Sequence, residues 1–169
     1  MQQTLIILRG APASGKSTVC EEIQKRKKNI VWFHVDSFKR FLNSRNEVSD
    51  RDHWYGAAAA SLDYFLNKKF SVLAEGIFQY HKHVNLFIQI AQKHGVKIKI
   101  FDFVAHNDIL LQRDKTRKGV PEGLRKALAE ETIKNLAHEI YNNKFPDAKI
   151  IDTEKESIEH IVQKILSEF

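Results

Sequence analysis

The chain has 169 residues, of which 43% are hydrophobic and 28% charged, a composition typical of one globular domain and not of a disordered chain. Its single cysteine, Cys20, excludes an internal disulfide and fits a reducing compartment such as the cytoplasm. The apolar run at residues 5–8 is too short to span a bilayer and no signal-peptide pattern precedes it, so we expect no membrane partner. The net charge of +6 favours an anionic partner, although a solvated basic surface would also explain it.

Strands and helices are predicted to alternate along the whole chain. Short apolar runs predict the strands, and longer amphipathic stretches with start and stop residues predict the helices. In chain order, the expected elements are a strand over 4–9, a helix over 16–28, a strand over 29–36, one or two helical turns over 36–42, a helix over 49–69, a strand over 70–76, a helix over 83–95, a strand over 96–105, helices over 107–119 and 124–143, a strand over 148–153 and a helix over 157–169.

This alternation predicts a doubly wound α/β fold, with a five-stranded parallel sheet and helices on both of its faces. No linker or repeat interrupts the pattern, so we expect a single domain over residues 1–169. In such folds the functional crevice lies at the carboxyl ends of the strands. The residues that follow each strand are therefore the candidates for chemistry.

Residues 10–17, Gly-Ala-Pro-Ala-Ser-Gly-Lys-Ser, match the phosphate-binding pattern G-x-x-x-x-G-K-[ST] and lie between a strand and a helix. The glycines let the backbone approach phosphate oxygens, and the loop N–H groups and the start of the helix favour negative charge. The lysine of the pattern reaches the β- and γ-phosphates, and the following serine supplies a hydroxyl to Mg²⁺. The residues expected to hold the nucleotide are Gly10, Ala13, Ser14, Gly15, Lys16, Ser17 and Thr18, with Ser17 also at the metal.

Asp36 follows the second strand, and Lys39 and Arg40 come shortly after it. In a phosphotransferase, a carboxylate here accepts the proton of the attacking hydroxyl, and the nearby cations hold the acceptor. The alternative is that Asp36 only caps the helical turns that follow it.

Glu75 ends the third strand, where a carboxylate can support the Mg²⁺ water shell or orient the acceptor. A strand-end acid exposed in a turn is the alternative. Trp54 and Tyr55, which come earlier in the chain, either line an acceptor pocket or pack in the core.

Residues 107–126 are expected to form a helical lid. Arg113 and Arg117 are four residues apart and therefore on one face of a helix, and the glycines and proline of 119–123 would form a hinge. Arginines on such a lid can stabilise the charge that develops on the γ-phosphate, whereas the alternative is a solvated basic face. Weaker candidates in this region are Lys115 and Arg125.

Two further segments bear on the choice of nucleotide. Residues 143–147, Asn-Lys-Phe-Pro-Asp, resemble the guanine-reading pattern N-K-x-D, but Pro146 stands where the aspartate belongs, which argues against a GTPase. Residues 150–157, which run from the last predicted strand into the segment after it, are placed to lie beside an adenine. The expected cofactors are therefore ATP and Mg²⁺.

Four features, taken in chain order, resemble the small P-loop kinases grouped around polynucleotide 5′-hydroxyl kinase, chloramphenicol phosphotransferase and the zeta toxins. They are the sequence GAPASGKS, VDSFK after the second strand, an acid after the third strand and R-x-x-x-R in the lid. The resemblance covers nearly the whole chain. It implies a P-loop NTPase three-layer sandwich in which Lys16 and Ser17 bind ATP and Mg²⁺, Asp36 is the general base, and Arg113 and Arg117 contact the ATP phosphates.

The sequence departs from polynucleotide kinases at two positions. Those kinases have an arginine, bound to a phosphate of the acceptor, where this chain has Lys39, and an aspartate where it has Glu75. A lysine lacks the forked guanidinium that binds phosphate through two hydrogen bonds.

The residues therefore favour an ATP-dependent kinase that phosphorylates a hydroxyl acceptor, polynucleotide-kinase-like in its motifs. The acceptor is either the 5′-hydroxyl end of a polynucleotide or a small molecule such as a metabolite, a nucleotide sugar or an antibiotic. A nucleotide-dependent switch without an acceptor is the alternative of a different class. In the kinase, Lys39, Arg40 and Glu75 are expected to contact the acceptor.

Overall fold

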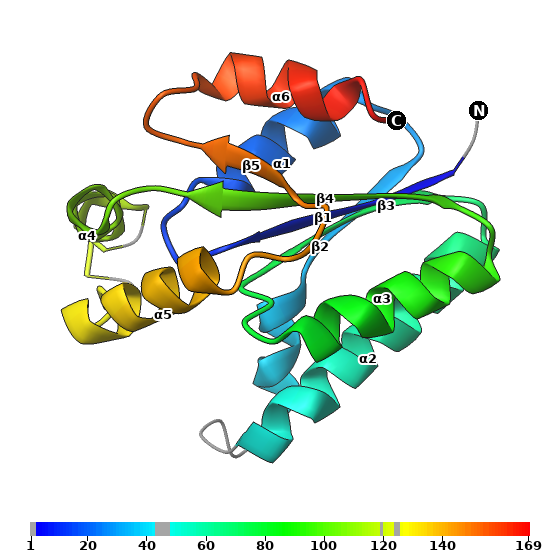
Figure 1. Ribbon diagram of the computed structural model, residues 1–169, viewed down its shortest axis with the longest axis horizontal. Helices are drawn as coiled ribbons and strands as arrows, with labels where there is room; N and C mark the ends of the chain where they lie inside the picture. The colour runs from blue at the N-terminus through cyan, green and yellow to red at the C-terminus, as the bar shows by residue number, and fades with distance from the viewer. Residues whose placement is uncertain (1–2, 43–47, 119, 124–125) are drawn as a thin grey trace.

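The computed structural model describes residues 3–42, 48–118, 120–123 and 126–169, and its centre is one parallel sheet. The five strands pair in the order β2-β3-β1-β4-β5, with the first strand of the chain in the middle (Figure 1). Apolar residues dominate them, as expected for strands buried on both faces. Their bounds are β1 (Thr4–Gly10), β2 (Ile30–His34), β3 (Ser71–Gly76), β4 (Lys97–Val104) and β5 (Lys149–Asp152).

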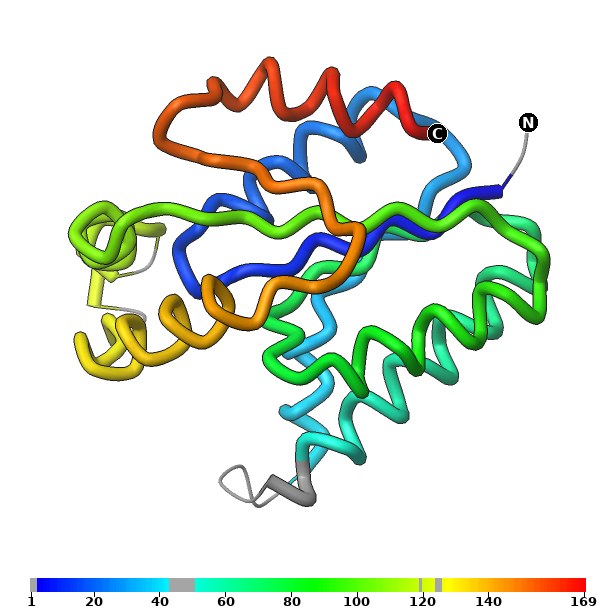
Figure 2. The backbone as a smooth tube through the Cα atoms, viewed as in Figure 1, coloured from blue at the N-terminus to red at the C-terminus, as the bar shows by residue number. Residues whose placement is uncertain are grey.

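Helices cover both faces of the sheet, which confirms the predicted fold class. α1 (Lys16–Arg26) and α6 (Ile158–Leu166) lie on one face, and α2 (Val48–Asn67) and α3 (His81–Lys93) lie on the other (Figure 1). α4 (Asn107–Thr116) lies beyond the carboxyl ends of the strands, and α5 (Glu130–Asn142) follows it. Figure 2 shows that the start of β1 and the end of α6 lie on the side of the molecule opposite α4. Among the described helices, none is both long enough and apolar enough to cross a membrane.

Several predicted elements have different limits in the structure, and the largest shift is at the start of α5. The last helix of the expected lid was predicted from residue 124, but α5 begins at Glu130 and residues 126–129 are not helical. The cause is a tertiary contact, because the buried Asp114 carboxylate accepts the N–H of Leu128 at 2.7 Å and holds this stretch outside a helix. The turns predicted over 36–42 form a 3₁₀ helix, η1 (Val35–Phe41).

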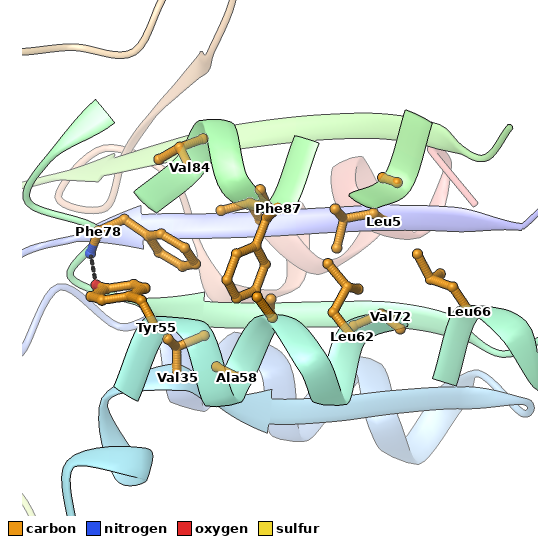
Figure 3. Close-up of a cluster of buried hydrophobic side chains, with 14 of the residues drawn as sticks. Leu5, Val35, Tyr55, Ala58, Leu62, Leu66, Val72, Phe78, Val84 and Phe87 are labelled. Atoms are coloured by element: carbon orange, nitrogen blue, oxygen red, sulfur yellow. Dashed lines mark hydrogen bonds between the residues drawn. The ribbon is translucent and has the colours of Figure 1, made fainter. Parts of the chain in front are cut away.

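The core between the sheet and α2 and α3 is a continuous layer of apolar side chains (Figure 3). Phe87 of α3 meets Phe78 edge-to-face, and the Tyr55 ring packs against Phe78 from α2. The Tyr55 hydroxyl accepts the N–H of Phe78 at 2.9 Å, which is the dashed line in Figure 3. This contact fixes the turn after β3, although Phe78 has a positive φ of 45°, a conformation that a side chain of this size rarely adopts.

A buried ion pair holds the same turn through the carbonyl of Phe78. Arg9 of β1 is fully buried and donates to Asp102 of β4 at 2.8 Å, to the Phe78 carbonyl at 2.8 Å and to the Asn143 carbonyl at 2.7 Å. Asp102 also accepts the N–H of Phe145 at 3.1 Å. One guanidinium therefore joins the central strand, the turn after β3 and the segment after α5. Asn143 belongs to the sequence that resembles the guanine-reading pattern, and it contributes to this network through its backbone carbonyl.

Candidate active site

The phosphate-binding sequence forms a tight loop between β1 and α1. A Cβ atom on Gly10 would lie 2.7 Å from the Phe103 carbonyl oxygen and 2.9 Å from the Ser14 hydroxyl, so only glycine fits there. Gly15 has a φ of 93° at the start of α1, which also favours glycine. Ala13 has a positive φ of 62°, a backbone conformation that was not predicted from the sequence. These constraints give the loop the shape that its motif predicts.

Lys16 lies inside this loop. Its ammonium donates to the carbonyls of Gly10 and Ala11 at 2.9 Å each and to the Ser14 hydroxyl at 3.2 Å. Burial lowers the pKa of Lys16, while the carboxylates of Glu75 and Asp36 oppose that shift by favouring the charged form. The loop therefore holds a cation at its centre, with two acids nearby.

Ser17, which follows Lys16 at the start of α1, is paired with Glu75 of β3. The Ser17 hydroxyl donates to Glu75 Oε2 at 3.0 Å, and Glu75 is fully buried. Glu75 Oε1 has no hydrogen-bond partner among the described residues, and His34 Nε2, on the neighbouring strand, is 4.0 Å away. A buried carboxylate oxygen without a partner is costly. Glu75 is thus not the exposed turn residue of the alternative interpretation.

Asp36 lies at the carboxyl end of β2 and is oriented by a backbone contact. Its Oδ2 accepts the N–H of Ile77 from the turn after β3 at 3.0 Å. Its second carboxylate oxygen accepts no hydrogen bond from the residues that the structure describes. Asp36 does lie in the first turn of η1, but η1 has no side-chain cap, so capping does not account for this residue.

The two arginines of the lid region line one cleft, but their side chains have different partners. Arg113 of α4 donates to the hydroxyl and the carbonyl of Thr153, both at 2.8 Å. Arg117 was predicted on the same helical face, and this is wrong, because α4 ends at Thr116 and Arg117 has extended backbone angles. Its guanidinium lies 3.0 Å from the buried Asp114 carboxylate. Both arginines nevertheless line the cleft.

The cleft has a volume of about 610 Å³ and extends from the phosphate loop to the segment after β5. Its lining includes apolar and basic residues, and several of them were not predicted from the sequence. Thr153 and Glu156 lie in the segment predicted to border the adenine, whereas Ile158 and Phe103 add an apolar surface that had no motif to mark it. The lining residues include Ser14, Lys16, Ser17, Thr18, His34, Phe103, Arg113, Arg117, Lys118, Thr153, Glu156 and Ile158.

Other predicted residues lie outside this cleft. Asp36 and Glu75 are not in the cleft lining, and neither are Lys39 and Arg40, which are exposed on η1. Trp54 and Tyr55 are buried and belong to the core, which agrees with packing and not with an acceptor pocket. Lys115 is exposed on α4 and does not line the cleft. Arg125 and Gly119 lie outside the described residues.

The fold and this site define a P-loop kinase-type nucleotide-binding domain. A family model described as an AAA domain, AAA_33, matches residues 5–140. The chain belongs to this family. No curated protein sequence matches it.

Solved structures share the fold over nearly the whole chain at low sequence identity. A gluconokinase from Sinorhizobium meliloti 1021 has a TM-score of 0.72 at 15% identity, covering 98% of this chain and 90% of that chain. The tunicamycin resistance protein of Deinococcus radiodurans has a TM-score of 0.67 at 14% identity, covering 98% and 95%. A chain of the Pnkp1/Rnl/Hen1 RNA repair complex has a TM-score of 0.66 at 20% identity, covering 92% of this chain and 50% of that chain.

Proposed function

We propose that the protein transfers the γ-phosphate of ATP to a hydroxyl acceptor. The observation that carries the proposal is the arrangement of three groups at adjacent strand ends: the buried ammonium of Lys16, the Ser17–Glu75 pair, and an Asp36 carboxylate with one oxygen bound and the other open. Lys16 suits the phosphates of ATP, the Ser17–Glu75 pair suits its metal ion, and Asp36 suits a general base.

In the proposed reaction, the free oxygen of the Asp36 carboxylate accepts the proton of the acceptor hydroxyl. The acceptor oxygen then forms a bond to the γ-phosphorus as the bond to the β–γ bridging oxygen breaks, and ADP leaves with that oxygen. Lys16 gives up its hydrogen bonds to the loop carbonyls and donates to the β- and γ-phosphates instead. Arg113 and Arg117 stabilise the negative charge that develops on the phosphates.

The residues behind the loop fit Mg²⁺. When bound, Mg²⁺ neutralises charge on the β- and γ-phosphate oxygens. The Ser17 hydroxyl would bind it directly, and the partnerless Oε1 of Glu75 would accept a hydrogen bond from its water shell. Mg²⁺ sites commonly use few protein ligands together with phosphates and waters, which agrees with this sparse donor set.

The lid and the domain are part of the same proposal. We infer that residues 1–169 act as one kinase domain and that the region of residues 107–126 closes over the ATP phosphates. This region contains α4, whereas α5 begins beyond it at Glu130. The adenine would lie against Ile158 in the apolar part of the cleft. ATP dependence and the single cysteine support a cytoplasmic location.

The acceptor belongs to one of two classes, a polynucleotide 5′-hydroxyl end or a small-molecule alcohol. The structural neighbours include proteins whose names point to a sugar acid, an antibiotic and RNA repair. The motifs favour the polynucleotide class, while Lys39 in place of an arginine weakens that choice.

The test is transfer of labelled γ-phosphate from ATP to a panel that contains 5′-hydroxyl RNA and DNA oligonucleotides, nucleosides, nucleotide sugars, sugars and sugar acids. We expect one class to be labelled, and Lys16→Ala to abolish the labelling. Lys25→Ala is the matched control, because it removes an exposed lysine at the far end of α1. ATP binding without labelling of any acceptor would favour the nucleotide-dependent switch and contradict the proposal.

A further inference from the structure

Arg51 lies at the end of the α2 face that packs into the core. The buried residues that follow it along this face, at helical spacing, are Tyr55, Ala58, Leu62 and Leu66. The Arg51 side chain continues this row past the core and reaches the turn after β3. Sequence reasoning gave Arg51 no role, because nothing in its local pattern distinguishes it from a surface arginine.

The partners of Arg51 among the described residues are neutral. Its Nη1 donates to the side-chain oxygen of Gln79 and lies 3.5 Å from the Tyr80 hydroxyl, and the guanidinium carbon is 5.6 Å from the centre of the Tyr80 ring. Arg51 is half-buried, and the contacts of its guanidinium within the described residues are with Gln79 and Tyr80 and not with a carboxylate. A cation that is partly removed from water loses part of its hydration free energy. Without a countercharge that loss is not offset, and a bound anion would offset it.

Arg113 offers a comparison within the same molecule. It is likewise half-buried and donates to neutral oxygens, those of Thr153, and it lines the cleft proposed for ATP. By contrast, the described arginines with structural roles are paired with acids: Arg9 with Asp102, and Arg26 with Glu22 and Glu159. In its neutral partners Arg51 resembles Arg113, whereas Arg117, which also lines the cleft, lies against the Asp114 carboxylate.

Arg51 and Asp36 bind neighbouring parts of one short turn. Asp36 accepts the N–H of Ile77, and Arg51 donates to the side chain of Gln79, two residues further on. The Tyr55 hydroxyl accepts the N–H of Phe78, the residue between them. Burial raises the pKa of Tyr55, the charge of Asp36 adds to that rise, and the charge of Arg51 opposes it. Asp36 and Arg51 therefore bind residues two apart in one turn, and an acceptor that spans this turn would meet both side chains.

The other charges near this turn leave room for an anion. Lys39 and Arg40 are exposed on η1, the helix that also carries Asp36. Asp52, next to Arg51 on α2, is already bound to Lys82 and His83. Glu139 of α5 accepts from the Gln79 side-chain amide, which separates it from Arg51.

We propose that Arg51 binds an anionic group of the acceptor, a carboxylate or a phosphate, and so selects alcohols that carry such a group near the hydroxyl to be phosphorylated. The anion takes the place of the Gln79 amide oxygen and accepts two hydrogen bonds from the guanidinium fork. This inference rests on the proposed function, since it names the acceptor class for the same site. It favours sugar acids, phosphorylated metabolites and polynucleotide ends over neutral sugars and neutral antibiotics.

The test measures acceptor binding in the full chain, with Mg²⁺ and a non-hydrolysable ATP analogue in the nucleotide site. Calorimetry compares two matched pairs, glucose with gluconate and adenosine with adenosine 3′-monophosphate, so that carboxylate and phosphate are tested separately. We expect an anionic member to bind at least about 10-fold more tightly than its neutral partner. Arg51→Ala should remove that preference, and Arg51→Lys should restore part of it because the charge remains without the fork.

Two further variants test whether the preference for anionic acceptors depends on Arg51 itself. Gln79→Glu places a carboxylate beside Arg51 and should abolish the preference while keeping Arg51 in place. Arg26→Ala removes an exposed arginine at the far end of α1 and should leave the preference unchanged. Unfolding midpoints of all variants show whether each one is folded under the conditions of the titration.

The inference is wrong if neither anionic member binds more tightly than its neutral partner, or if the preference survives in Arg51→Ala. Its failure differs from failure of the proposed function. Transfer of γ-phosphate to neutral alcohols without an anion preference contradicts the inference alone. Arg51-dependent anion binding in a protein that transfers no phosphate to any acceptor contradicts the proposed function alone.

Discussion

Replacing Arg9 with methionine tests the buried network that holds the turn after β3 in position. Methionine keeps an unbranched chain of similar length and removes the charge and every donor. Asp102 then remains fully buried without a countercharge, and the carbonyls of Phe78 and Asn143 each lose a hydrogen bond. Removal of one partner of a buried ion pair costs about 3–5 kcal/mol.

That cost is a large part of the free energy of unfolding, which is about 5–15 kcal/mol for a typical domain. With a urea m-value of about 2 kcal/mol/M, a loss of about 4 kcal/mol lowers the unfolding midpoint by about 2 M. Tryptophan fluorescence follows this transition, because Trp54 is buried in the core. Lys25→Ala, which breaks an exposed ion pair with Glu22, should leave the midpoint unchanged.

The pH dependence separates this electrostatic effect from a simple packing defect. Burial already raises the pKa of Asp102 in the wild type, and Arg9 opposes that shift. Without Arg9 the folded-state pKa rises further above the unfolded value. A group with a raised folded pKa stabilises the fold below its unfolded pKa, and this contribution is lost as the pH rises through the folded pKa. Arg9→Met should therefore be less destabilised at pH 5 than at pH 8. A midpoint within about 0.5 M of wild type at pH 8, or a deficit that does not change with pH, would refute the reasoning.

Three further predictions concern the turn, the phosphate loop and the carboxyl-terminal helix. Tyr55→Phe leaves the buried N–H of Phe78 without an acceptor and should lower the free energy of unfolding by about 1–3 kcal/mol in urea titrations, and an unchanged midpoint would mean that the contact is not needed. Gly10→Ala places a methyl group 2.7 Å from the Phe103 carbonyl and should weaken binding of a fluorescent ATP analogue at least about 10-fold, so wild-type affinity would contradict the proposed loop geometry. Glu168 has a pKa lowered to about 2, first by a hydrogen bond from Lys149, so its stabilising effect is present above about pH 4.5 and is lost as the pH falls toward 2. Glu168→Gln should therefore be less stable than wild type at pH 7 and equal to it near pH 2, as measured by urea midpoints, and a deficit that persists at low pH would count against the ion pair as its cause.

The strands and the phosphate loop could be predicted from the sequence because their signals are local. An apolar run, a glycine-rich loop and a helix follow one another within residues 4–26, and the backbone has little choice there. Asp36 and Glu75 were found by the same logic, since the fold class predicts that residues at strand ends share one edge of the sheet. Their partners, Ile77 and Ser17, belong to that edge as well.

The lid was predicted less well because tertiary contacts override its helical pattern. Asp114 is buried, accepts the N–H of Leu128 and lies against Arg117, and these contacts end α4 and delay α5. Helical propensity in residues 117–129 does not reveal a carboxylate that comes from the preceding helix. Arg51 was missed for a related reason, because its partner Gln79 is 28 residues away and only the fold brings them together.

Asp36→Asn separates the proposed role of Asp36 as the base of phosphotransfer from its structural contact with Ile77. The asparagine side-chain oxygen can still accept the N–H of Ile77, so the geometry is kept while the basic oxygen is lost. The measurement compares binding of ATP with transfer of its γ-phosphate to the acceptor that the panel identifies. We predict wild-type ATP affinity and a transfer rate reduced at least about 100-fold. Transfer by Asp36→Asn at the wild-type rate would contradict the account.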